Sequence, residues 1–197
     1  MIIGITGGSG CGKTTALEVI RDMGGMVLDC DAIYHRLLET SVPLLSAIDA
    51  RFPGVVCQGK LERKKLGEVV FGDPQALLDL NAIAHSAVKD EVLRLLSPPP
   101  TLAAIDAIAL FEGGLAELCD YTVAICAPRE SRIARLMARE GITRQYAESR
   151  IDAQKSDRQF REIANFTLVN NSTRQDFYAA ALALFQSLRD KPTIDSK

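Results

Sequence analysis

A formal net charge of -2 over 197 residues gives this chain no strong electrostatic field, which argues against nucleic acid or an anionic membrane surface as a partner. The length and the 47% hydrophobic content suit a single α/β domain over 1–197. The five cysteines form no C-x-x-C pair, and no apolar run approaches the length that crosses a bilayer. We therefore expect a cytoplasmic protein with reduced thiols and no membrane segment.

The first predicted element is a strand that runs through a glycine-rich loop into a helix. The opening residues 2–5 form a short β-branched run of the kind found in buried parallel strands. Glycines then interrupt the apolar pattern, which resumes as a helix over 14–21. The residues of "GITGGSGCGKTT" that satisfy the P-loop pattern G-x-x-x-x-G-K-[ST] are Gly7, Gly12, Lys13 and Thr14.

Each residue type in this motif suits the binding of phosphate. Glycines let consecutive backbone N–H groups turn inward around a phosphate, at the positive end of the following helix. Lys13 would place a charge near the β- and γ-phosphates, and the Thr14 hydroxyl would be a ligand for Mg²⁺. The alternative is a glycine-rich turn that binds nothing, but the strand before the motif and the helix after it favour a nucleoside triphosphate.

Four more apolar runs predict strands that are buried on both faces of a parallel sheet. They are "MVLD" at 26–29, "LAAID" at 102–106, "YTVAI" at 121–125 and "FTLV" at 166–169. Residues 32–96 carry helical periodicity, including a helix over 61–71 and a long one with Asp73 as N-cap and Pro74 as first residue. So long a crossover predicts a helical insert over the carboxyl edge of the sheet, where an acceptor could be held. The predicted fold is α/β, a five-stranded parallel sheet flanked by helices.

The region 129–161 is unusually basic. Arg132, Arg135 and Arg139 are spaced i, i+3 and i+7, which places them on one face of a helix. A solvated face with Glu–Arg pairs is one interpretation of any single arginine here. For the whole segment we favour a lid, because phosphoryl transfer needs charge neutralised on the phosphate oxygens and water excluded.

Carboxylates follow two of the predicted strands. Asp29 and Asp31 come after the second strand, which we expect to neighbour the P-loop strand, and one of them could accept a proton from an attacking hydroxyl. Asp106 ends the third strand, the position of an acidic residue that holds Mg²⁺ in P-loop proteins. Each could instead cap a helix or a turn. Glu112, near the same edge, is a weaker candidate.

Several further segments are similar to the dephospho-CoA kinase family, in the order and at the spacing of that family. They are "IIGITGGSGCGKTT", "VLDCDAIYHRLLE", "LERKKLGEVVFGDP", "LNAIAHSAV", "IDAIALFEGGL", "LMAREG", "ESRIDAQ" and "VNNS". The resemblance covers essentially the whole chain. The chain departs from the family pattern where Ser86 stands in place of a proline, where 108–110 replaces Pro-Leu-Leu, and at 169–171.

The resemblance implies a P-loop kinase fold with a CoA-binding insert at 32–100 and a lid at 129–161. It implies that ATP, with Mg²⁺, phosphorylates the 3′-hydroxyl of the ribose of dephospho-CoA to give coenzyme A. Asp31 would be the base, Lys13 the phosphate clamp and Arg139 a lid arginine, with Thr14 and Asp106 as metal ligands. The ATP-binding residues would be Gly8, Ser9, Gly10, Cys11, Gly12, Lys13, Thr14, Thr15 and Asn170. The acceptor-binding residues would be Asp31, His85, Leu110, Phe111 and Glu112.

Two other functions stay open from the sequence. A different small-molecule kinase, acting on a nucleoside or nucleotide, would share the loop, the lid and Mg²⁺ but hold another acceptor. A nucleotide-dependent switch would hydrolyse slowly and need a partner protein, and the long insert and arginine-rich segment count against it. Small molecules are the expected partners, and we infer no obligate protein partner.

Overall fold

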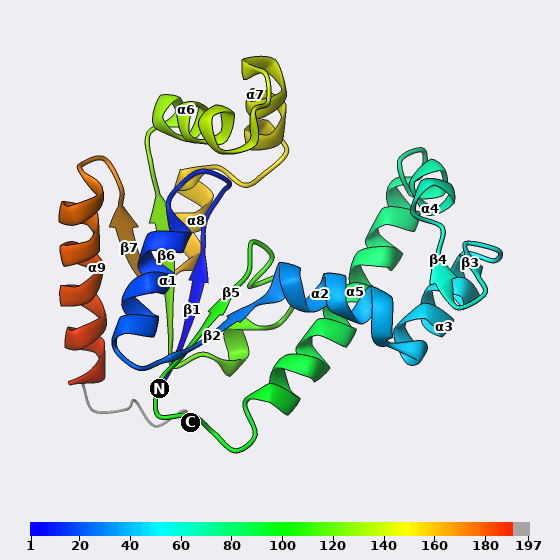
Figure 1. Ribbon diagram of the computed structural model, residues 1–197, viewed down its shortest axis with the longest axis horizontal. Helices are drawn as coiled ribbons and strands as arrows, with labels where there is room; N and C mark the ends of the chain where they lie inside the picture. Colours follow the sequence, from blue (N-terminus) through cyan, green and yellow to red (C-terminus); the bar gives the residue numbers. More distant parts are fainter. Residues whose placement is uncertain (191–197) are drawn as a thin grey trace. The chain divides into compact units, whose positions relative to one another are not determined.

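The computed structural model describes residues 1–190, which divide into two compact units (Figure 1). The first unit contains Met1–Leu28, Pro100–Phe111 and the chain from Leu115 onward, and the second contains Asp29–Pro99 and Glu112–Gly114. Each unit has its own hydrophobic core.

The first unit is built on a five-stranded sheet. Its strands are β1 (Ile2–Thr6), β2 (Met26–Asp29), β5 (Ala103–Asp106), β6 (Tyr121–Cys126) and β7 (Phe166–Val169). Their order across the sheet is β2-β5-β1-β6-β7, with β1 parallel to β5 and β6, and β6 parallel to β7. All five predicted strands are thus confirmed to within about a residue at each end.

The prediction that the second strand, β2, lies next to the P-loop strand β1 was wrong. β5, and not β2, pairs with β1, so that Ile5 lies opposite Asp106. The burial of the strands gives the reason: the first three residues of β5 are buried, as in an interior strand, whereas Met26 and Asp29 of β2 are exposed, as at an edge. The position of its strand therefore does not support Asp31 as the base.

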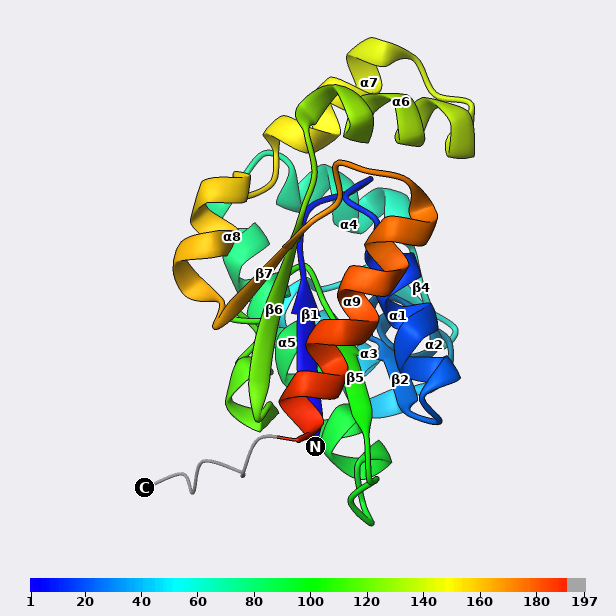
Figure 2. The ribbon, with the colours of Figure 1, turned by 90° about the vertical axis from the view of Figure 1, so that its left-hand side faces the viewer.

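Helices cover both faces of this sheet. The helices of the first unit are α1 (Lys13–Asp22), α6 (Arg129–Glu140), α7 (Arg144–Asp152), α8 (Asp157–Ile163) and α9 (Arg174–Arg189), with a 3-10 turn at Ala116–Leu118. Figure 2 shows α1 and α9 on one side of the sheet, where Phe177 and Phe185 of α9 pack in one cluster with Ile3, Ile5 and Val123. On the other face, Phe160 of α8 packs with Ala124 and Cys126.

The second unit is helical. It contains α2 (Cys30–Thr40), α3 (Val42–Arg51), the two-residue strands β3 (Val56–Cys57) and β4 (Lys60–Leu61), α4 (Arg63–Val70) and α5 (Pro74–Leu95). As predicted, Asp73 caps α5: its side chain accepts hydrogen bonds from the backbone N–H groups of Gln75 and Ala76. The prediction of one helix over 61–71 missed the hairpin, whose turn places Gln58 and Gly59 at positive φ.

Candidate active site

The P-loop joins β1 to α1 in a conformation that needs glycine. Gly7, Gly10 and Gly12 have φ of 139°, 76° and 103°, in the left-handed region that other residues rarely adopt. Neighbouring groups also leave no space for a side chain: a Cβ on Gly8 would lie 2.1 Å from Nη2 of Arg132. The loop is therefore held tightly by the elements around it.

The start of α1 leaves backbone donors available to a ligand. Gly12 is its N-cap, no side chain caps this end, and the first turn carries no acidic residue. The unsatisfied N–H groups and the positive end of the helix dipole together favour an anion. Lys13 is the first residue of the helix, and its Nζ donates to the carbonyl of Gly7 at 2.8 Å, across the mouth of the loop. The side chain of Thr14 is exposed.

Asp106 and the P-loop come together at the carboxyl edge of the sheet. Asp106 ends β5 in register with Ile5, two residues before Gly7. Burial raises the pKa of the Cys11 thiol, and the charges of Lys13, Arg132 and Asp106 act on the same thiol. The thiol is therefore protonated at neutral pH, and Cys11 packs as a small buried residue.

Two arginines of α6 contact the P-loop. Arg132 is only 4% exposed, and its Nε donates to the carbonyl of Ser9 at 2.9 Å, while Nη1 pairs with Oδ1 of Asp157 at 3.2 Å. Arg135 donates from Nη1 to the carbonyls of Gly10 and Cys11 at 3.3 and 3.4 Å. The predicted basic helix face thus rests on the loop through its first two arginines.

Asn170, predicted to bind ATP, lies immediately after β7 and also contacts the P-loop. Its side chain is buried, its Nδ2 donates to the carbonyl of Cys11 at 3.0 Å, and its Oδ1 accepts from Arg135 at 3.1 Å. A Cβ on Gly12 would lie 2.1 Å from this Nδ2. In this conformation Asn170 positions the loop, and its contact with ATP stays a prediction.

Arg139, the predicted catalytic arginine, lies at the far end of α6. Its side chain is 58% exposed and pairs with Glu140 at 2.5 Å, and this contact, with a second one from Arg150, holds the pKa of Glu140 below its usual range. The structure does not bring Arg139 to the loop as it does Arg132 and Arg135. Its action on phosphate stays a prediction that requires the lid segment to move.

The two candidate bases, both in the second unit, have different environments. Oδ1 of Asp29 accepts from the N–H of Ala32 at 2.9 Å, so that Asp29 is the N-cap of α2. Asp31 lies in the first turn of the same helix, and its side chain is exposed. The structure gives Asp29 a structural role and leaves the carboxylate of Asp31 open to a ligand.

The other predicted acceptor residues differ in accessibility. Leu110 is fully buried and would clash with a Cβ on Gly4, so that its side chain belongs to the core of the first unit. Phe111 is half-buried and Glu112 exposed. His85 is half-buried on α5, and burial lowers its pKa, which leaves it neutral at pH 7. A neutral imidazole can donate or accept a hydrogen bond but brings no charge to a phosphate.

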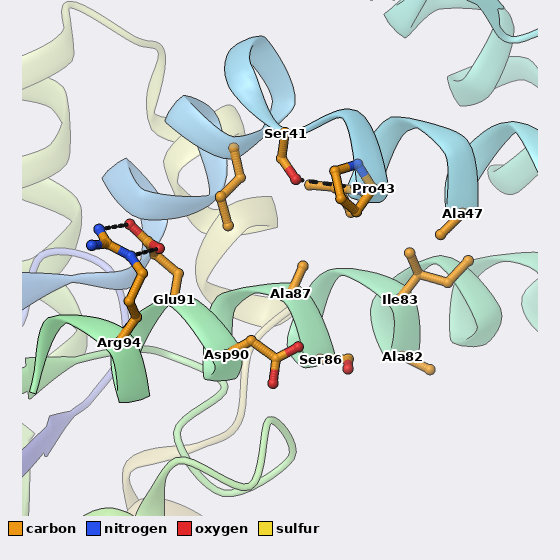
Figure 3. A pocket seen from close by; sticks show the side chains of 12 residues that line it. Ser41, Pro43, Ala47, Ala82, Ile83, Ser86, Ala87, Asp90, Glu91 and Arg94 are labelled. Carbon is orange, nitrogen blue, oxygen red and sulfur yellow. Dashed lines mark hydrogen bonds and ion pairs between the residues drawn. The ribbon is translucent and has the colours of Figure 1, made fainter. Parts of the chain in front are cut away.

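The second unit contains an open groove of about 680 Å³ between the α2–α3 corner and α5. Figure 3 shows Pro43 and Ala47 facing Ile83 and Ala87 across it, with the ion pair of Glu91 and Arg94 at one end. Ser86, where the family has proline, also lines it. Its volume and largely apolar lining suit a small-molecule ligand.

Three residues that contact the P-loop were not predicted to do so from the sequence. Arg132 and Arg135 were noted only as members of a basic face, and Gln154 only as the end of "ESRIDAQ". Gln154 contacts Ser9 twice, at 2.8 Å in each case. These contacts join residues more than 120 positions apart in the sequence, so no local pattern indicates them.

No helix among residues 1–190 is long and apolar enough to cross a bilayer. The same residues contain no group of three or more His, Cys, Asp or Glu side chains placed to hold a metal ion.

Comparison with known proteins decides the family. The family model described as dephospho-CoA kinase matches residues 1–176. The chain belongs to the dephospho-CoA kinase family. This kinase accordingly phosphorylates dephospho-CoA with ATP as donor, in the last step of coenzyme A synthesis.

Individual relatives agree over almost the whole length. A dephospho-CoA kinase of Thermus thermophilus is 35% identical over 192 residues, which cover 95% of this chain and 92% of the relative. A solved crystal structure from Thermus thermophilus is 34% identical and superposes with a TM-score of 0.78, covering 95% of this chain and 97% of that one. A shikimate kinase of Acinetobacter baumannii, at 20% identity and a TM-score of 0.57, covers 96% of this chain and 95% of its own, and shares the fold.

One substitution tests whether the packing of the P-loop matters for nucleotide binding by the kinase. Gly12→Ala adds a Cβ at a φ of 103° and against Asn170, so we expect Mg-ADP affinity to fall at least about 10-fold. Gly24→Ala is the matched control, because Gly24 has a φ of 79° but open space around it. Calorimetric titration and the melting temperature check both variants. Equal losses of affinity in the two variants would contradict a specific role for the packing of Gly12 against Asn170.

Proposed function

We propose that the P-loop of the first unit holds Mg-ATP, that the helical insert holds dephospho-CoA, and that Asp31 directs the 3′-hydroxyl of the ribose. The observation that carries the nucleotide half is the P-loop with its uncapped helix start and Lys13. The observation that supports the acceptor half is the groove of the insert. An open, largely apolar site with an ion pair at one end suits a substrate with a long, mostly uncharged arm and a charged nucleotide end.

The donor set fits Mg²⁺. The Thr14 hydroxyl and the Asp106 carboxylate are hard oxygen ligands, and Mg²⁺ in such enzymes is held by one or two side chains with phosphate oxygens and waters completing its shell. The absence of a larger acidic cluster among residues 1–190 agrees with such a shell. When bound, Mg²⁺ would neutralise charge on the phosphates. Lys13 would act on the β- and γ-oxygens, and its hydrogen bond to Gly7 would be exchanged for the nucleotide.

On the acceptor side, Asp31 is favoured over Asp29 because Asp29 is engaged as a helix cap. A ribose hydroxyl is a weak nucleophile unless a carboxylate orients it or accepts its proton. His85, neutral at pH 7, would contribute a hydrogen bond and no charge. A cytoplasmic location is a further proposal, supported by five free cysteines, because disulfides are rare in reducing compartments.

The acceptor is tested by turnover. We expect purified protein with Mg-ATP to convert dephospho-CoA to a product that is heavier by one phosphoryl group, with little ADP formed when acceptor is omitted. Nucleosides and nucleoside monophosphates serve as competing acceptors, analysed by mass spectrometry. Faster phosphorylation of a nucleoside would favour the other small-molecule kinase. ADP formation that does not depend on any acceptor would favour a switch.

Substitutions of Arg139 test whether segment 129–161 acts as a lid over the phosphates. If the lid segment brings Arg139 to the phosphates, Arg139→Ala should lower kcat by about 10-fold or more, and Arg139→Lys should restore it only in part because a planar fork becomes a point charge. Arg158→Ala is the control, because Arg158 lies in the same lid segment, is 87% exposed and pairs with Glu162. Parent-like kcat in both Arg139 variants would assign Arg139 to a solvated helix face.

A further inference from the structure

Ser9 in the P-loop is held by two side chains of the lid segment 129–161 through three of its atoms. Its backbone N–H donates to Oε1 of Gln154 at 2.8 Å, and its hydroxyl oxygen accepts from Nε2 of the same residue at 2.8 Å. Its carbonyl accepts from Nε of Arg132 at 2.9 Å. A single loop residue therefore joins the P-loop to two parts of the lid segment.

The two lid residues are fixed to different degrees. Arg132 is buried, and its partner Asp157 also accepts, through Oδ2, from the backbone N–H of Ala127 at the end of β6, at 3.2 Å. Gln154 lies in the short linker between α7 and α8 and is only half-buried. Apart from Ser9, its side chain contacts Arg132, whose Nη2 donates to the same Oε1 at 3.4 Å. Gln154 is thus the less buried of the two lid residues that hold Ser9.

The amide oxygen of Gln154 accepts a hydrogen bond that a phosphate would also need. Backbone N–H groups of a P-loop bind a nucleotide by donating to phosphate oxygens. The Ser9 N–H cannot make a full hydrogen bond to both Gln154 and a phosphate. Nucleotide that uses this donor must therefore displace Gln154.

We propose that Gln154 is a positioning residue, which holds Ser9 while the P-loop is empty and is released when phosphate takes the Ser9 N–H. The proposal rests on nucleotide binding by the P-loop. Its consequence is that the free enzyme is stabilised by a contact that the nucleotide complex loses, so that Gln154 lowers nucleotide affinity. Release of the Gln154 side chain also removes the contact between the α7–α8 linker and the P-loop. The position of the lid segment would therefore depend on whether nucleotide occupies the P-loop.

Three substitutions of Gln154 separate this role from simple packing. Gln154→Ala removes the competing acceptor, and we expect Mg-ADP and Mg-ATP to bind about 2- to 5-fold more tightly, the size of one net hydrogen bond. Gln154→Met keeps length and volume and is expected to match or exceed that gain, since it leaves the Ser9 N–H unsatisfied until phosphate arrives. Gln154→Glu keeps the acceptor and adds charge, and should bind about 10-fold more weakly.

Opposite signs for alanine and glutamate support the proposal, with KM for ATP following the calorimetric affinity. A merely structural role would instead weaken binding in all three variants together with the melting temperature. Gln159→Ala is the matched control, because Gln159 completes the capping box of α8, five residues along the chain. Ser9→Ala, which removes the hydroxyl partner of Nε2, should give no added gain when combined with Gln154→Ala.

The outcome distinguishes this inference from the proposed function. If the parent enzyme fails to bind Mg-ADP, the nucleotide site itself is wrong. If the parent binds nucleotide and phosphorylates dephospho-CoA, but Gln154→Ala and Gln154→Met both bind no more tightly than the parent, the displacement of Gln154 is overturned alone.

Discussion

Replacing Lys13 with alanine is expected to lower kcat for phosphoryl transfer to dephospho-CoA by about 10²- to 10³-fold. A cation aimed at the β- and γ-oxygens stabilises the transition state most, because those oxygens gain charge as the bond breaks. Nucleotide affinity should fall less than kcat. Steady-state kinetics with both substrates saturating, together with Mg-ADP titration, separate the two effects.

Lys13 also makes a contact within the protein itself, so its substitution needs a control. Its ammonium donates to the carbonyl of Gly7, so the alanine variant also loses a contact within the loop. Lys13→Arg retains a cation, and Arg21→Ala removes a positive charge from the last turn of the same helix. We expect Arg21→Ala to keep parent kcat. Parent-like turnover by Lys13→Ala would contradict the assignment of the loop as the catalytic phosphate site.

Replacing Asp31 with asparagine is expected to lower kcat by about 10²-fold or more while Mg-ADP affinity stays near that of the parent. Asparagine keeps the size and much of the hydrogen bonding but cannot accept the hydroxyl proton. Steady-state kinetics with both substrates saturating and Mg-ADP titration of the two proteins check both statements.

Asp29→Asn is the control for Asp31→Asn, two residues away. Asparagine is as good an N-cap as aspartate, so α2 should keep its start and kcat should change little. If Asp29→Asn loses transfer and Asp31→Asn does not, Asp29 is the base. If neither variant loses activity, positioning and lid charge account for the reaction without a carboxylate base.

The strands could be predicted from sequence because each is a short apolar run bounded by polar or turn residues, a pattern typical of strands in a parallel sheet. The order of the strands could not. The runs at 26–29 and 102–106 are both short, apolar and end in aspartate, so the sequence does not indicate which of them pairs with β1. The structure places β5 beside β1 and β2 at the edge of the sheet. The hairpin at 56–61 was missed because strands of two residues carry too little periodicity to compete with the helical pattern that follows.

The candidate site likewise contains residues that could be predicted from the sequence and residues that could not. The P-loop motif is contiguous, so its glycines, Lys13 and Thr14 were predicted together with their geometry. The contacts of Arg132 and Gln154 with Ser9 depend on long-range packing, and no local pattern indicates which arginine of a basic helix face points inward. Leu110 was placed at the acceptor by family position, whereas its full burial against Gly4 assigns its side chain to the core.

The position of the transferred phosphate tests the central claim most directly. Product made from Mg-ATP and dephospho-CoA should be purified and examined by ³¹P and ¹H NMR. We expect one new phosphomonoester coupled to the ribose 3′ proton, one ADP for each product molecule, and loss of this signal in Asp31→Asn. A phosphate on the 2′-hydroxyl or elsewhere in the acceptor, or ADP and free phosphate without a phosphorylated acceptor, would contradict the account.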